Sequence, residues 1–181
     1  DGWFGHRSND DSSLGDWQVF AKKFPHGLKH FADYVHGKGL KFGLWFEPEM
    51  ISYDSDLYRN HPDYLMQVPG REPSPARDQY ILDLSRQEVV DNIFEQVKAI
   101  LTANDVDYVK WDMNRHLSDI YSVGLPPERQ GEVYHRYMLG VYQLMDRLTS
   151  AFPDVLFEGC SGGGGRFDAG LAYYMPQSWT S

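Results

Sequence analysis

The chain has 181 residues, of which 41% are hydrophobic and 15% aromatic, enough for one domain with a sizeable core. Its formal net charge of -9 argues against a nucleic acid or an anionic membrane as a partner. The single cysteine, Cys160, excludes an internal disulfide, and no apolar run approaches the ~18 residues of a transmembrane helix.

The first part of the chain predicts a helix, a buried strand and a long loop. Residues 25–39 predict the helix, because four apolar residues recur at helical spacing: Leu28, Phe31, Ala32 and Val35. The dense apolar run at residues 40–49 predicts a buried strand, which Pro48 terminates. A polar, proline-rich loop follows, over residues 52–78.

The remainder predicts strands that alternate with helices. Short apolar runs predict strands at residues 80–85, 106–112 and 155–160, and QSWTS at the C-terminal end predicts a fifth. Ser85 begins a capping box with Glu88, which opens a helix carrying an apolar stripe: Val89, Ile93, Val97 and Ile100. A helix of about 20 residues has a second stripe: Val133, Tyr137, Val141, Leu144 and Leu148. A short helix is expected within GGGGRFDAGLAYYM.

This alternation predicts an α/β fold with a parallel sheet and crossover helices. Either a (β/α)8 TIM barrel or an open doubly wound sheet satisfies it. We favour a partial barrel that lacks its first strand and its last strands, because a barrel gathers strand ends around one pocket. Polar or aromatic residues mark these strand ends: Asp1, Trp45, Glu47, Asp83, Lys110, Asp112 and Cys160. No GxGxxG motif follows a first strand, so a dinucleotide site has no support.

The stretch DYVKWDMNR places Lys110 two residues before Asp112 at the end of a predicted strand. Side chains two apart on a strand point the same way, and a neighbouring ammonium group lowers the pKa of a carboxyl group. An ionised carboxylate can act as a nucleophile or stabilise a cationic transition state. A structural ion pair is the alternative that the local sequence leaves open.

The neighbouring strand ends carry further candidates. Trp45 lies on the opposite strand face from its two neighbours, so it is either a sugar-stacking platform or a core residue. Glu47, on the same face, is either catalytic or a brace for the following loop. Cys160 has no neighbouring base and is more typical of a small buried residue than of a nucleophile.

The glycine run after Cys160 lets backbone N–H groups approach a ligand closely. No Gly-Lys-Ser/Thr follows it, so it is not a P-loop. The seven histidines show no tight ligand set, although His26 and His30 share a helix face. We therefore expect no metal site.

Five motifs occur in order over the whole chain: DGWFGHR, LWFEPEM, VKWDMNR, CSGGGGR and QSWTS. This combination resembles the family 36 glycoside hydrolases, the α-galactosidase family of microbes. The resemblance implies that Asp112 is the catalytic nucleophile. It also implies a set of substrate-binding residues: Asp1, Trp45, Arg77, Lys110, Asn114, Cys160 and Gly162. Arg71 is a weaker alternative to Arg77.

The resemblance implies a retaining α-galactosidase that acts on melibiose- or raffinose-type α-galactosides and needs no cofactor. A galactosyl transferase of the raffinose- or stachyose-synthase kind and a noncatalytic sugar-binding module are the alternatives. The family carries a second aspartate before Asp1, which this sequence lacks, and its general acid/base aspartate follows SWTS. We therefore expect residues 1–181 to be the central, inactive fragment of a catalytic domain, which the family flanks with β-domains. We also expect a cytoplasmic, homo-oligomeric full-length protein.

Overall fold

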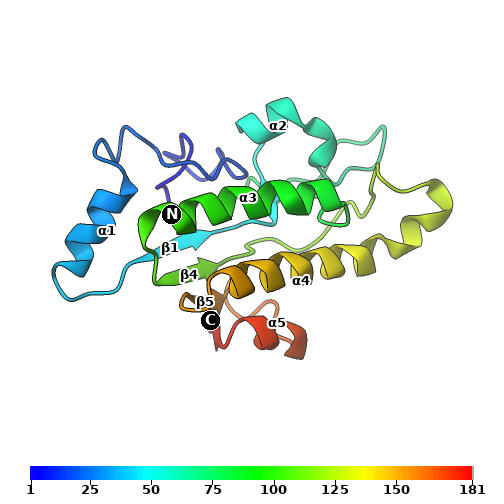
Figure 1. The fold of residues 1–181 in the computed structure, drawn as a ribbon. Coiled ribbons are helices and arrows are strands. Elements are labelled where there is room, and N and C mark those ends of the chain that lie inside the picture. Colours follow the sequence, from blue (N-terminus) through cyan, green and yellow to red (C-terminus); the bar gives the residue numbers. More distant parts are fainter. Residues whose placement is uncertain (181) are drawn as a thin grey trace.

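The computed structural model describes residues 1–180, in which long helices lie over one face of a small parallel sheet (Figure 1). The helices are α1 (Leu28–His36), α2 (Asp56–Asn60), α3 (Gln87–Asn104), α4 (Val133–Ala151) and α5 (Ala169–Tyr174). The strands are β1 (Gly43–Phe46), β2 (Met50–Ile51), β3 (Tyr80–Ile81), β4 (Tyr108–Trp111), β5 (Leu156–Gly159) and β6 (Gln177–Ser178). Two 3-10 helices are η1 (Pro62–Tyr64) and η2 (Pro127–Glu132).

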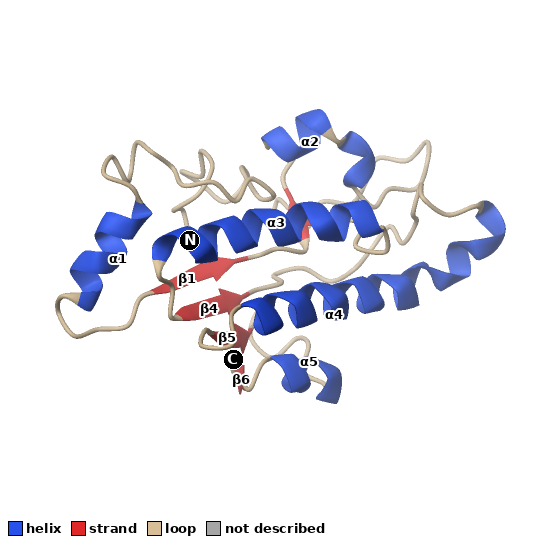
Figure 2. Cartoon of the chain, in the orientation of Figure 1, coloured by secondary structure: helices blue, strands red, loops and turns tan. Residues whose placement is uncertain are grey.

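The main sheet has the order β1-β4-β5-β6, and every neighbouring pair is parallel (Figure 2). Parallel neighbours need a crossover, and α3, α4 and α5 supply it between successive strands. The register sets Trp45 opposite Lys110, and Lys110 opposite Glu158. The predicted strands near 40–47, 106–112 and 155–160 are therefore confirmed, as is the fifth strand at its first residues. Ser181 lies outside the described residues.

The predicted parallel strand at 80–85 is wrong. Tyr80–Ile81 forms β3, which pairs antiparallel with β2 in a separate two-stranded sheet. The Leu82 N–H donates to Glu49 O and extends this pairing, and the Met66 N–H donates to Ile81 O from a third segment. The preceding loop contains only α2 and η1, so the chain folds back beside β2 instead of crossing over the sheet.

Asp83 and Ser85 consequently have other roles than those predicted. Asp83 is fully buried, and its Oδ1 accepts the Ser85 hydroxyl at 2.5 Å, so it does not line a strand-end pocket. Helix α3 begins after Arg86, which makes no side-chain capping bond. The predicted Ser85 capping box is wrong, because the N-cap position of α3 is Arg86 and not Ser85.

The core lies between the sheet and the helix pair α3 and α4. Both predicted apolar stripes are buried there in full. On α1, Leu28 and Ala32 are buried, whereas Phe31 is exposed. No helix within residues 1–180 is long and apolar enough to cross a membrane.

Candidate active site

The C-terminal ends of β1, β4 and β5 meet at one edge of the sheet. The Asp112 N–H donates to Phe46 O at 2.8 Å, and the Cys160 N–H donates to Trp111 O at 2.7 Å. These bonds continue the two ladders by one residue, so the side chains that follow each strand lie side by side. The prediction that Asp112 and Cys160 share one rim is confirmed.

The Asp112 carboxylate is only 6% exposed and is surrounded by hydrogen-bond donors. Its Oδ2 accepts the Trp45 indole N–H at 3.0 Å. Its Oδ1 accepts the backbone N–H groups of Met113 at 2.9 Å and Gly162 at 3.4 Å. Burial by itself raises the pKa of Asp112, but hydrogen bonds from Trp45, Cys160 and Asn114 lower it below its ordinary value.

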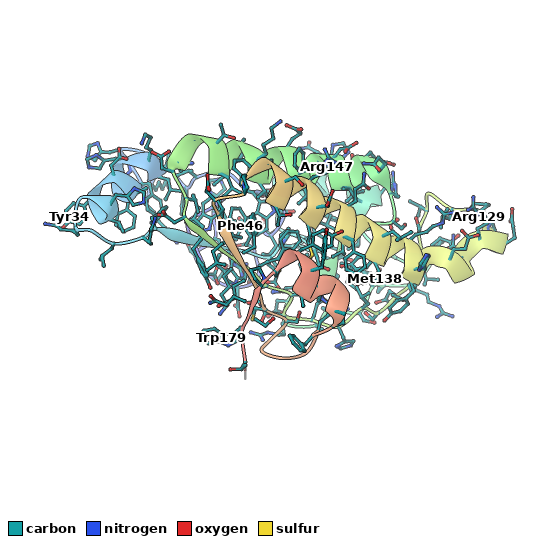
Figure 3. The ribbon with its side chains drawn as sticks, turned by 60° about the horizontal axis from the view of Figure 1, so that its bottom comes forward. Tyr34, Phe46, Arg129, Met138, Arg147 and Trp179 are labelled. Atoms are coloured by element: carbon teal, nitrogen blue, oxygen red, sulfur yellow. The ribbon has the colours of Figure 1, made fainter. Side chains whose placement is uncertain are left out.

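The structural ion pair that the local sequence left open is not formed, because no ion pair within 4.0 Å joins Lys110 and Asp112 in residues 1–180. The Lys110 ammonium lies 3.7 Å from the centroid of the Trp179 ring, a cation–π contact. Figure 3 shows Trp179 near the C-terminal end of the chain. Burial and the Asp112 carboxylate raise the pKa of the Cys160 thiol, and the positive charge of Lys110 opposes part of this rise. Hydrogen-bond donors, rather than the ammonium group, therefore hold the Asp112 charge.

Glu47 links two loops beside Asp112. It is fully buried, its Oε1 accepts the Asn114 N–H at 2.5 Å, and its Oε2 accepts the Gln79 side-chain amide at 2.8 Å. Burial raises the pKa of Glu47 to about 7, although these hydrogen bonds oppose the rise. Of the two roles that the sequence leaves open, the contacts favour the brace.

Arg77 and Asn114 lie together beside this brace. Arg77 is exposed, and its Nη1 donates to Asn114 Oδ1 at 3.4 Å. Asn114 in turn contributes to the lowered pKa of Asp112. Both predicted substrate-binding residues are thus brought to the same rim as Asp112.

Asp1 reaches the site through Arg7, a residue that sequence reasoning missed. The Arg7 Nε–H donates to Asp1 Oδ1 at 2.8 Å, and the guanidinium carbon lies 5.8 Å from the centroid of the Trp45 ring. The Trp3 indole N–H donates to Trp45 O at 2.9 Å, which fixes this segment to β1. The position of Arg7 within DGWFGHR was the available signal.

A buried ion pair behind the rim was also missed. Both oxygens of Glu49 accept from the Arg166 guanidinium, at 2.9 and 2.5 Å. Glu49 also accepts the Trp111 indole N–H at 2.9 Å and the Tyr137 hydroxyl at 2.6 Å. Burial by itself raises the pKa of Glu49, but these donors outweigh burial and bring the pKa below its ordinary value. The two charged partners occur within LWFEPEM and CSGGGGR, 117 residues apart.

All 181 residues match the protein family described as melibiase. The chain belongs to the melibiase family. Alpha-galactosidase 1 of Pediococcus pentosaceus is 74% identical over the whole chain, which covers 25% of that relative. An α-galactosidase of Lactobacillus acidophilus is 68% identical, again over 100% of the chain and 25% of the relative. The chain thus spans about a quarter of the length of these curated relatives.

Solved structures agree with this assignment. The GH36 α-galactosidase AgaA from Geobacillus stearothermophilus is 57% identical with a TM-score of 0.98, over 100% of this chain and 25% of that chain. Variants of AgaA have been solved in complex with raffinose and with stachyose. This chain therefore has the α/β fold of GH36 α-galactosidases, with a parallel sheet and crossover helices.

The predicted site residues fall into two groups. Five of them converge at one carboxylate: Trp45, Asn114, Cys160, Gly162 and Asp112 itself. Arg77 is attached to this cluster through Asn114, and Asp1 through Arg7, while Lys110 extends from the same strand toward Trp179. No group of three or more His, Cys, Asp and Glu side chains in residues 1–180 is arranged to hold a metal ion.

Proposed function

We propose that the full-length protein containing these residues is a retaining α-galactosidase that hydrolyses terminal α-galactosides of the melibiose and raffinose type. The observation that carries the proposal is the buried Asp112 carboxylate, which hydrogen-bond donors hold in its ionised form at the rim of the sheet. The names of the relatives, all α-galactosidases, support the substrate class.

Asp112 acts as the nucleophile in this proposal. Its carboxylate attacks the anomeric carbon, the bond to the leaving oxygen breaks, and a covalent galactosyl-enzyme forms. A general acid protonates the leaving oxygen and then activates the water that releases galactose. We expect that residue directly after Ser181, outside the described residues. Lys110, Arg77 and Asn114 bind sugar hydroxyls, and no cofactor takes part.

The strand order supports a partial (β/α)8 barrel as the setting of this chemistry. Strands β1, β4, β5 and β6 are added in one direction, with α3 and α4 over the same face (Figure 1). A doubly wound sheet reverses its order at a switch point, and no reversal occurs within residues 1–180. We propose that these residues are the central part of the barrel, within a homo-oligomeric protein.

Two other functions share parts of this site. A galactosyl transferase would use the same nucleophile and pass the sugar to an acceptor hydroxyl instead of water. A sugar-binding module would bind the galactoside without turnover. The relatives' names favour hydrolysis over both. With raffinose as the substrate, the ratio of free galactose to transfer product distinguishes hydrolysis from transfer, and a binding module would form neither product.

The test of the nucleophile is Asp112→Gly in the full-length enzyme. We expect a folded protein whose hydrolysis of an aryl α-galactoside falls by roughly a thousandfold or more. Added azide should restore turnover, because the small anion fits the space that the carboxylate leaves. It attacks from the face that Asp112 used, so the product should be the β-galactosyl azide.

Asp154→Gly is the matched control, because Asp154 is an exposed turn residue before β5. It should keep normal hydrolysis with no response to azide. Substantial hydrolysis by the Asp112→Gly variant without azide, or an α-galactosyl azide product, would show that Asp112 is not the nucleophile.

A further inference from the structure

The glycine run after β5 has little of its own to hold it in place. Gly162 and Gly163 have positive φ angles of 56° and 90°, a conformation that glycine adopts at no steric cost. The Ser161 N–H donates to Gly163 O and the Gly165 N–H donates to Ser161 O, both at 3.1 Å. The first side chain after the run is Arg166, so the placement of the run depends on what that residue contacts.

Arg166 contacts Glu49 through a bidentate pair. The Arg166 Nη1 and Nη2 groups each donate to one oxygen of the fully buried Glu49 carboxylate, and the Arg166 side chain is itself largely buried. Bidentate arginine–carboxylate pairs fix orientation as well as distance, since the planar fork accepts one geometry. Arg166 therefore ties the end of the glycine run to the segment that follows β1.

The same carboxylate is also connected to the other flank of Asp112. Trp111, which directly precedes Asp112, donates its indole N–H to Glu49 Oε1 at 2.9 Å. On the glycine side, the Gly162 N–H donates to Asp112 Oδ1 at 3.4 Å. The Glu49 carboxylate thus accepts hydrogen bonds from both chain segments that position Asp112, through Trp111 and through Arg166.

We infer that Glu49 and Arg166 are positioning residues for Asp112: they hold the strand end and the glycine run at the separation that keeps the Gly162 N–H on the carboxylate. The inference rests on the proposed role of Asp112 as nucleophile. In this role the pair influences the reaction of Asp112, which a contribution to folding alone would not do. Neither residue touches the substrate in this arrangement.

Loosening the pair should change the acidity of Asp112. If the glycine run moves away, the carboxylate loses a donor to its charged form, and its pKa rises. Because the nucleophile reacts only when ionised, the acid limb of the pH profile of kcat/KM should move to higher pH. A purely structural role would lower the amount of folded enzyme and leave that limb in place.

The experiment uses Arg166→Lys in the full-length enzyme, with an aryl α-galactoside as the substrate. Lysine keeps the positive charge and loses the fork. We expect kcat to fall on the order of 10- to 100-fold, as for a small misplacement of reacting groups. We expect KM to change little, and the acid limb of kcat/KM to rise by roughly half a pH unit or more.

Arg147→Lys is the matched control. Arg147 pairs with Asp91 at 2.5 Å and lies over the Phe94 ring, so it joins α4 to α3 on the outer side of the molecule (Figure 3). Its replacement is the same arginine-to-lysine change, but at an arginine that donates a single hydrogen bond to a half-exposed carboxylate, remote from Asp112. Kinetic constants and pH profile should stay those of the unmodified enzyme.

A second variant, E49Q/R166Q, removes both charges together and so leaves no unpaired buried charge. It should show the same shift of the acid limb, and it tests the inference even if Arg166→Lys does not fold. An unchanged acid limb and normal kcat in either folded variant would overturn the inference, as would failure of both variants to fold. If the unmodified enzyme itself does not cleave the galactoside, the proposed function fails instead.

Discussion

The carboxyl group of Glu47 lies between the Gln79 loop and the Asn114 loop, shielded from solvent. Each of its oxygens takes one donor, which is less than water would supply to an anion. Burial consequently raises its pKa to about 7, so Glu47 changes its protonation state near neutral pH. This makes Glu47 a point at which stability and pH are linked.

We predict that Glu47→Gln makes the full-length protein more stable at pH 8 than the unmodified protein, with little difference at pH 5. The folded state holds the Glu47 proton up to about pH 7, whereas an unfolded chain releases it near the ordinary value of 4.5. Stability is therefore lost as the pH rises between these values, by about 3 kcal/mol for a shift of this size. Thermal unfolding at both pH values measures the difference.

The amide also suits this position. Gln79 Oε1 is buried without a partner, so turning the Gln79 amide lets that oxygen accept from the new side chain. Glu95→Gln is the control, because Glu95 is exposed on α3. An identical stability difference at pH 5 and pH 8 for Glu47→Gln would contradict the prediction.

The sequence predicted the residues at this site better than it predicted their partners. Asp112, Trp45 and Cys160 were found because each follows or ends a strongly apolar run, which is local information. Glu49 and Arg166 were missed because they meet only after the sheet and the glycine run have formed. Lys110 was assigned to its neighbour in sequence, whereas the tertiary structure places it over the Trp179 ring.

Among the elements, α4 approaches the backbone of a neighbouring segment very closely at Gly140. A methyl group added there would lie 1.8 Å from the backbone oxygen of Leu84, which is far inside van der Waals contact. The approach places α4 against the segment that leads into α3. Only a residue without a side chain fits between them.

We predict that Gly140→Ala destabilises the folded protein by about 2 kcal/mol or more, because either α4 or the Leu84 segment must shift. This loss should occur although alanine is the better helix former. A lower midpoint of thermal unfolding in the full-length protein would show it. Gly131→Ala is the control, since nothing lies within 4 Å of the added methyl group in η2. Equal stability of the two variants would contradict the prediction.

The helices and strands were predictable where the apolar pattern was long or where the segment was an apolar run of the fully buried kind. Helices α3 and α4 show complete apolar stripes, and β1, β4 and β5 are near-continuous apolar runs of the kind that parallel sheets bury. Residues 80–85 have the same composition as these strands, so composition did not reveal their antiparallel partner. That pairing depends on how the loop between residues 52 and 78 folds back.

At the scale of the whole molecule, the sheet has two outer strands within residues 1–180. Along β1, the Trp45 carbonyl oxygen accepts a hydrogen bond from the Trp3 indole N–H. Beside β6, the aromatic side chains of Phe167 and Trp179 line one pocket and are 72% and 50% exposed. Unpaired strand edges and exposed aromatic clusters are features that proteins cover. A closed barrel would cover both edges with further strands.

We predict from this that, in the full-length protein, the backbone amides of β1 and β6 exchange with deuterium about as slowly as those of β4. Strand β4 is the internal reference, because it pairs on both sides with β1 and β5. Hydrogen exchange followed by mass spectrometry resolves residues 43–46, 108–111 and 177–179 separately. A barrel has no free edge, so all three segments should be protected until the domain unfolds. Rapid exchange at β1 or β6 while β4 stays protected would show a free edge, and the sheet would then be open.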